Sequence, residues 1–142
     1  MRLPPVDLTS LLVADEGEVL HVYLDSRGVQ TLGVGRRVDE LGGISNDESR
    51  YMLGNDVQKV KNFCALRFPW LEAQSAARIA VVQSMCFIFG GAGLLGWPHF
   101  LSAMQAGDWE AAAQELETSK WAVEAPERVA RFAKSLRSGE FV

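Results

Sequence analysis

The sequence has few of the residues that build disulfide-rich or metal-bound domains. Its 142 residues include two cysteines and two histidines. Neither cysteine lies in a Cys-x-x-Cys or Cys/His spacing typical of a metal site, so we expect two free thiols and no metal. The chain also lacks internal repeats and low-complexity tracts, and 48% of its residues are hydrophobic. Residues 1–142 are therefore expected to form one globular domain with a real core.

A net positive charge is missing as well. The formal charge of −4 argues against a nucleic-acid-coating protein, because counterion release needs a basic face. The first ten residues hold two prolines and no apolar core before Leu11, so we expect no cleaved signal peptide. Residues 79–95 are uncharged over nearly transmembrane length, but polar and glycine residues interrupt them. This favours a buried helix and turn over stable membrane insertion.

Turn and capping residues outline the N-terminal elements. Asp7 predicts the N-cap of a short helix that Gly17 ends, with an apolar stripe to which Leu3 belongs. Two strands, about 19–24 and 29–34, follow and are joined by a tight turn from Asp25 to Gly28. Glycines at 33 and 35 are poor sheet formers, so they indicate either close approach of a backbone or ligand, or a bulged strand.

Helix signals dominate the rest of the chain. Ser45 with Glu48 three residues later matches a capping box, which predicts a bridging helix over about 46–66. Further helices are expected at 76–89, from Pro98 to Gly107, at 109–117, and from Pro126 to Gly139. The predicted class is α+β, mostly helical, with a small β-hairpin N-terminal lobe (about 12–60), the bridging helix, and a helical C-terminal lobe (about 67–142 plus the N-terminal helix).

Three residues near the N-terminus bring acid and hydroxyl groups together. Glu16 is expected in the last turn of its helix, where unpaired carbonyls and the helix dipole favour a protonated carboxyl. Asp25 begins the hairpin turn, and Thr31 lies on the second strand. An acid, a carboxylate and a hydroxyl are the parts needed to hydrolyse a glycosidic bond. Taken alone such a pair is weak evidence, since most surface carboxylates have no catalytic role.

The spacing of these residues resembles that of the phage lysozymes of the T-even type, the muramidase endolysins of glycoside hydrolase family 24. The resemblance covers nearly the whole chain, in order: DEG, VYLD, TLGVG, the ISNDES helix start, MCFIFG, and SKW followed by APERVARF. Agreement at so many ordered positions is unlikely by chance. The resemblance implies that Glu16 is the general acid, that Asp25 is the second carboxylate, and that Thr31 helps to hold the attacking water.

The resemblance also implies a function. We expect hydrolysis of the bond between N-acetylmuramic acid and N-acetylglucosamine in peptidoglycan, for lysis of a bacterial host, without a metal or organic cofactor. The protein would accumulate in the host cytoplasm, pass through a separate holin-type membrane pore, and act in the periplasm. With no coiled-coil seam or intermolecular disulfide evident, a monomer is expected. Inversion at the anomeric carbon is the family expectation.

The substrate cleft is expected to include Gly33, Phe87, Ile88 and Arg128, of which Arg128 resembles the family arginine that approaches the catalytic acid. Two positions depart from the pattern. Arg36 stands where many members have a histidine, and we predict a structural ion pair between Arg36 and Asp56. Arginine stays charged throughout the working range, so such a pair would lose the pH response of histidine. Ile88 replaces an amide that can bind a sugar, which leaves one substrate contact uncertain.

Two alternatives stay open on the sequence alone. The basic stripe on the last helix, Arg128 to Arg137, would suit a non-enzymatic membrane-active protein, although its hydrophobic face is expected in the core. A wall-binding relative that kept the fold and lost turnover is the second alternative, because fold alone does not fix function.

Overall fold

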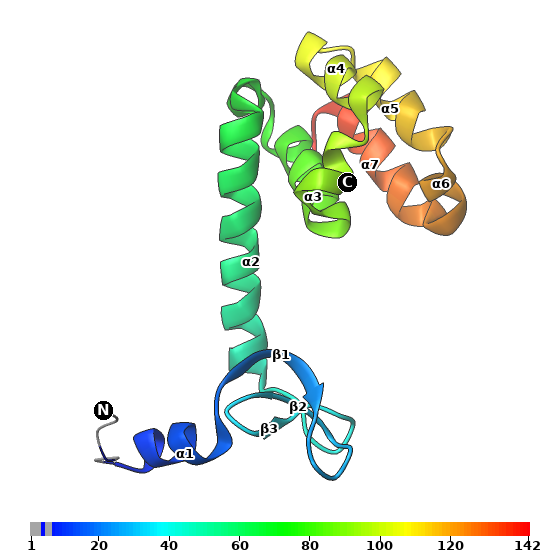
Figure 1. The fold of residues 1–142 in the computed structure, drawn as a ribbon. Coiled ribbons are helices and arrows are strands. Elements are labelled where there is room, and N and C mark those ends of the chain that lie inside the picture. The colour runs from blue at the N-terminus through cyan, green and yellow to red at the C-terminus, as the bar shows by residue number, and fades with distance from the viewer. Residues whose placement is uncertain (1–3, 5–6) are drawn as a thin grey trace. The chain divides into compact units, whose positions relative to one another are not determined.

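The computed structural model of the chain describes residue 4 and residues 7–142. Leu3, which the sequence assigns to the first apolar stripe, lies outside the described residues. The chain divides into two compact units, one ending at Met52 and one running from Leu53 to Val142. Figure 1 gives the order of the elements.

The first unit begins with α1 (Leu8–Glu16), and its predicted caps are confirmed. The Asp7 carboxylate accepts a hydrogen bond from the Ser10 N–H at 2.8 Å. At the other end Gly17 has a φ of 73°, which a side chain would disfavour, and the helix stops there. By its contacts, α1 belongs to the same unit as the strands that follow it. The predicted packing of α1 on the helical lobe stays a prediction.

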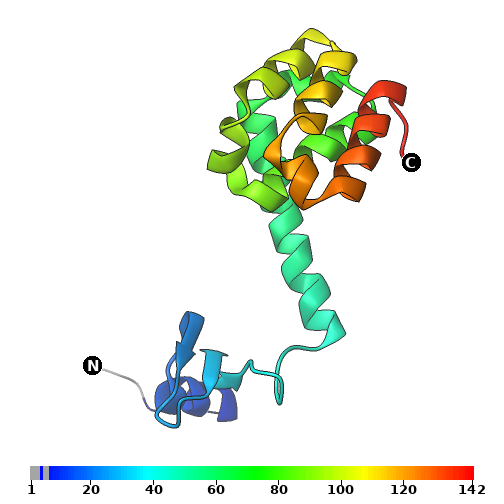
Figure 2. The same cartoon turned by 90° about the vertical axis from the view of Figure 1, so that its right-hand side faces the viewer.

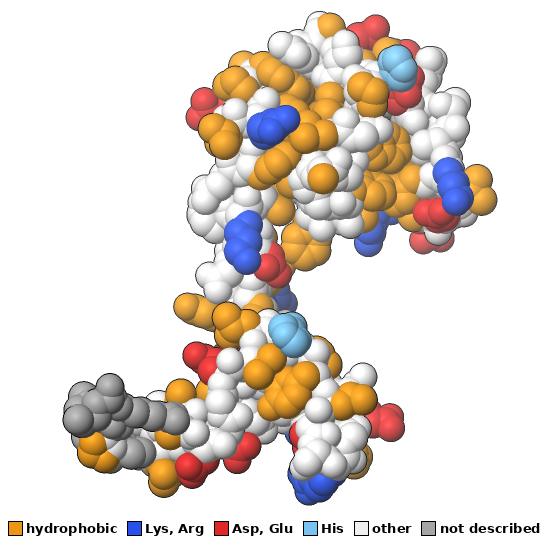
Figure 3. All heavy atoms as spheres, in the orientation of Figure 1, with side chains coloured by type: hydrophobic (Ala, Val, Ile, Leu, Met, Phe, Trp, Pro, Cys, Tyr) orange, Lys and Arg blue, Asp and Glu red, His pale blue; other side chains and the backbone are white. Residues whose placement is uncertain are grey.

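A three-stranded antiparallel sheet follows α1, with the strands in sequence order. It consists of β1 (Val19–Leu24), β2 (Gln30–Gly33) and β3 (Arg36–Arg37). In the register, Tyr23 pairs with Thr31, and an irregularity lies between Val19 and Tyr23. Much of β1 is exposed within this unit, and Figure 3 shows hydrophobic side chains on the surface of both units.

The long helix α2 (Asn46–Arg67) starts at the predicted capping box. The Glu48 N–H donates to the Ser45 hydroxyl at 3.1 Å, and the Glu48 carboxylate accepts from the Ser45 N–H at 2.9 Å. Two otherwise unpaired N–H groups are thereby satisfied, which explains why the helix begins here. The predicted helix over 46–66 is confirmed.

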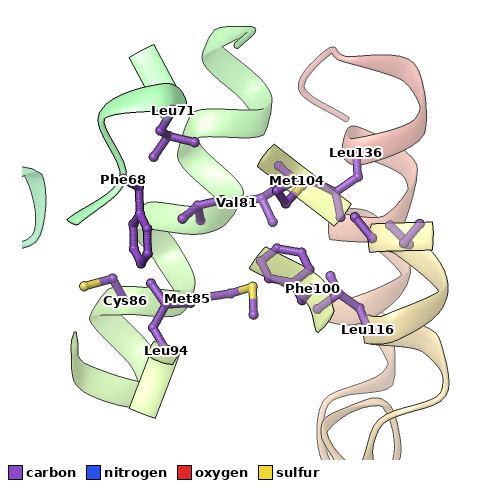
Figure 4. Close-up of a cluster of buried hydrophobic side chains, with 14 of the residues drawn as sticks. Phe68, Leu71, Val81, Met85, Cys86, Leu94, Phe100, Met104, Leu116 and Leu136 are labelled. Atoms are coloured by element: carbon purple, nitrogen blue, oxygen red, sulfur yellow. The ribbon is translucent and has the colours of Figure 1, made fainter. Parts of the chain in front are cut away.

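The second unit is helical throughout, as Figures 1 and 2 show. Its elements are η1 (Pro69–Ala73), α3 (Ala76–Leu95), α4 (Pro98–Ala106), α5 (Trp109–Glu117), α6 (Lys120–Glu124) and α7 (Pro126–Ser138). They enclose a core in which Met85, Phe100 and Leu116 have no exposed surface. In Figure 4 these side chains point toward one another from α3, α4 and α5. The mostly helical α+β class is confirmed.

The range of α3 contains a break at the predicted helix end. The helix that starts at Ala76 stops at Gly90, whose φ of 75° and ψ of 167° are not helical, and a second helical stretch then runs to Leu95. The predicted helix over 76–89 is confirmed, and the stretch after Gly90 was not predicted. Among the described residues, α3 is also the one helix long and apolar enough to cross a membrane by length and composition. Val82, Met85 and Leu94 of α3 are completely buried in the core, which supports the interpretation as a core helix.

Candidate active site

Glu16 lies at the end of α1, where the helix stops and the chain turns into the sheet. The Gly17 N–H donates to the carbonyl of Val13 at 3.0 Å, which closes the last turn. The Glu16 side chain is exposed and extends toward the turn between β2 and β3. A Cβ placed on Gly35 of that turn would lie 3.0 Å from Glu16 Oε2. The end of α1 and the β2–β3 turn therefore meet at this carboxyl group.

Asp25 opens the loop between β1 and β2. Its Oδ1 accepts hydrogen bonds from the backbone N–H groups of Arg27 at 2.8 Å and Val29 at 2.9 Å. The pKa of Asp25 is lowered chiefly by the Val29 hydrogen bond, with the Arg27 N–H and the charges of Arg27 and Arg37 adding to it against partial desolvation. The carboxylate is therefore ionised at neutral pH.

Thr31 is the buried polar member of the site, with 4% of its surface exposed. Its hydroxyl donates to the carbonyl of Val29 at 2.8 Å. Because that hydroxyl has one hydrogen and two lone pairs, the remaining capacity is to accept. A water bound to Thr31 would therefore direct a hydrogen at the hydroxyl and keep a lone pair free for attack.

The backbone of one residue, Val29, connects Asp25 with Thr31. The Val29 N–H donates to the Asp25 carboxylate, and the Val29 carbonyl accepts from both the Asp25 N–H, at 3.0 Å, and the Thr31 hydroxyl. Three groups of Asp25 and Thr31 are thus fixed around a single residue. The hairpin loop holds the ionised carboxylate and the hydroxyl in one rigid arrangement, which is what preorganised catalysis requires.

Arg36 has a partner that the sequence did not indicate. Its guanidinium contacts Glu48 at 2.8 Å and donates to the carbonyl of Gly43 at 3.3 Å. Both side chains are partly exposed, so the pair contributes modestly to stability. The predicted ion pair between Arg36 and Asp56, whose members belong to different units, stays a prediction.

Three of the predicted cleft residues come together in the second unit. Phe87, Ile88 and Arg128 line one hollow of about 530 Å³, on α3 and α7. Gln83 lines the same hollow and offers the amide that Ile88 lacks, five residues earlier in α3 and one helical turn from Phe87. Gly33 belongs to the first unit, with a φ of 67° and open space where a Cβ would lie.

The sequence did not predict the residues that contribute to the site through their backbone. The Val29 peptide and Gly35 carry no functional group in their side chains, so motif analysis gave them no role beyond the hairpin. Gly35 had one signal, its poor strand propensity, which indicated either close approach of a backbone or ligand, or a bulged strand. In the structure the group next to Gly35 is instead the Glu16 side chain.

The first unit thus places an acid at a helix end, an ionised carboxylate in a hairpin loop and a buried hydroxyl on the adjoining strand. On an α+β, mostly helical fold, these are the groups of a lysozyme-like glycosidase. Residues 14–134 match the family described as phage lysozyme, and the chain belongs to this family. Membership supports a peptidoglycan-hydrolysing lysozyme.

Two relatives extend the comparison. The chain is 24% identical over 164 residues to the pre-baseplate central spike protein Gp5 of Enterobacteria phage T4, covering 96% of this chain and 28% of that protein. It is 24% identical over 161 residues to a probable T4-type lysozyme 2 of Dictyostelium discoideum, covering 93% of this chain and 94% of the relative. The chain therefore spans under a third of the spike protein and nearly all of the second relative.

Proposed function

We propose that the protein cleaves the bond between N-acetylmuramic acid and N-acetylglucosamine in peptidoglycan, and that this activity lyses a bacterial host. The observation that carries the proposal is the hairpin loop in which the Val29 peptide fixes both the ionised Asp25 and the Thr31 hydroxyl. Family membership supports the substrate class.

In the proposed reaction, Glu16 gives its proton to the glycosidic oxygen, and the bond from that oxygen to the anomeric carbon breaks. A water held by Thr31 attacks the carbon, and its proton passes to the Asp25 carboxylate. The negative charge of Asp25 also stabilises the oxocarbenium-like transition state. This route inverts the anomeric carbon. Proton NMR of the first-formed sugar distinguishes it from a covalent route through Asp25, which would retain the configuration.

Further parts of the proposal concern the cell. The protein acts as a monomer in the periplasm after release from the host cytoplasm by a holin-type pore. The membrane-active alternative would need the apolar face of α7, yet Val129, Ala133 and Leu136 of that face are buried in the core. That burial counts against α7 acting as a free amphipathic helix.

Product analysis tests the proposed bond. Purified peptidoglycan digested by the wild-type protein should give fragments that end in reducing N-acetylmuramic acid, identified by borohydride reduction and mass spectrometry. Fragments ending in reducing N-acetylglucosamine, or free stem peptides, would contradict the proposed specificity. Glu16→Gln, which keeps the shape and removes the acid, should release no such fragments above about one hundredth of the wild-type rate.

A further inference from the structure

Gly35 lies in close contact with the Glu16 side chain. It lies in the turn between β2 and β3 with a φ of 64°. A Cβ built there would meet three atoms of one residue, lying 3.0 Å from Glu16 Oε2 and 3.2 Å from both Cδ and Cγ. Non-bonded carbon atoms pack best at about 3.5–4.0 Å, so such a Cβ would crowd the Glu16 side chain.

Among the positive-φ glycines of the described residues, such crowding occurs at Gly35 and at Gly139, where a Cβ would lie 2.9 Å from Nη1 of Arg78. A Cβ on Gly17, Gly28 or Gly43 would meet nothing within 4 Å, although all three have positive φ. At Gly107 the nearest atom is 3.7 Å away, which is an ordinary contact. Backbone conformation alone therefore accounts for those glycines, whereas Gly35 also leaves the space that the Glu16 carboxyl group fills.

We propose that Gly35 is a positioning residue for Glu16, because its missing side chain sets where the carboxyl group lies. The inference rests on the proposed function, in which Glu16 is the proton donor. A Cβ at residue 35 would force the Glu16 carboxyl group a few tenths of an ångström away from the turn. Because misplacement of a catalytic group by about 1 Å can lower a rate about a hundredfold, this smaller shift should lower it by up to about tenfold.

The test compares Gly35→Ala with Gly107→Ala. The two glycines have similar φ values, 64° and 73°, so both variants carry the same kind of backbone strain and should lose similar thermal stability. Gly107 follows α4, away from the proposed machinery. On purified peptidoglycan, Gly35→Ala should lower kcat between about three- and tenfold with little change in KM, while Gly107→Ala keeps wild-type kinetics. Equal activity of the two variants would overturn the proposal.

A double-mutant cycle with Glu16→Ala separates positioning from general damage to the fold. Alanine lacks Cγ, Cδ and Oε2, the three atoms that a Cβ at residue 35 would meet. Gly35→Ala should therefore cause no further loss of the residual activity in the Glu16→Ala background, although it lowers activity in the wild type. The same loss in both backgrounds would show that Gly35 acts on something other than the Glu16 side chain and would overturn the proposal.

A folding defect does not leave the proposal untested. If Gly35→Ala does not fold, Gly35→Asn carries the same Cβ on a residue that tolerates positive φ, and it should lose kcat in the same way. Full activity of a folded Gly35→Asn variant would refute the positioning role. Failure of the proposed function is distinguishable, because then Glu16→Gln itself would retain the wild-type rate.

Discussion

Thr31 offers a prediction that separates the effect of a substitution on activity from its effect on stability. Thr31→Val replaces the hydroxyl by a methyl of similar size. It removes the 2.8 Å hydrogen bond to the Val29 carbonyl, but that carbonyl still accepts from the Asp25 N–H. The free energy of unfolding should therefore fall by at most about 1 kcal/mol. Activity should fall about a hundredfold, because the water loses its acceptor.

Thr31→Ser should lose a similar amount of stability but keep its activity. It keeps the hydroxyl and deletes one methyl from a side chain that is 4% exposed. Removal of a buried methyl costs about 1 kcal/mol, or a shift in Tm of about 3 °C for a chain of this length. Its activity should stay within about threefold of wild type. Thermal unfolding followed by circular dichroism and release of reducing sugar from peptidoglycan measure the two properties. An active Thr31→Val, or a Thr31→Ser that loses activity with it, would refute the role given to the hydroxyl.

Three further predictions concern charge and burial. The pKa of Asp25 is lowered, which means that its ionised form stabilises the fold. The wild type should therefore have a higher Tm than Asp25→Asn above about pH 4, and this difference should disappear as the pH falls through the lowered pKa. A difference in Tm that does not depend on pH would contradict this. Arg78 lies 3.9 Å from the Trp109 ring and donates to two carbonyls at the end of α7, so Arg78→Leu should lower the free energy of unfolding by about 2 kcal/mol. In the control Arg67→Leu, which loses a ring contact at 6.0 Å, the loss should be under about 0.5 kcal/mol, and equal losses in urea unfolding would count against the Arg78 contacts. Burial raises the pKa of Cys64 to about 12 and also raises the pKa of Cys86. Mass spectrometry should therefore find that neither thiol reacts with iodoacetamide until the protein is unfolded. Rapid labelling of the native protein would argue against their burial.

Elements fixed by local chemistry were predicted from the sequence. The start of α2 follows from Ser45 and Glu48, which satisfy each other's N–H groups within four residues. The start of α1 follows in the same way from the carboxylate of Asp7. Such caps depend on neighbouring residues alone, so the sequence pattern predicts them.

Elements that depend on tertiary packing were not predicted. A second helical stretch follows the break at Gly90 because Leu94 is buried completely in the core, and local propensity gives no sign of that. The short helix α6 has no side-chain cap to mark its start. Arg36 reaches Glu48 because of the path that the loop before α2 takes, which no spacing rule specifies.

The candidate site also contains groups that the sequence predicted and groups that it did not. Glu16, Asp25 and Thr31 could be named because their side chains carry chemistry and their spacing resembles a known family. The arrangement around the Val29 peptide could not, since backbone groups are the same at every residue and only the fold brings these together. The contact of Gly35 with Glu16 likewise depends on the sheet register, in which Val19 pairs with Gly33.

The central claim is that Glu16 is the acid that cleaves peptidoglycan, and turbidity loss of outer-membrane-stripped Gram-negative cells tests it most directly. The matched control for Glu16→Gln is Glu18→Gln, which neutralises another exposed glutamate two residues further on. We expect Glu18→Gln to clear cells like the wild type, and Glu16→Gln to clear them at least about a hundredfold more slowly. Equal clearing by both variants would show that the Glu16 carboxyl has no catalytic role and would contradict the proposed mechanism.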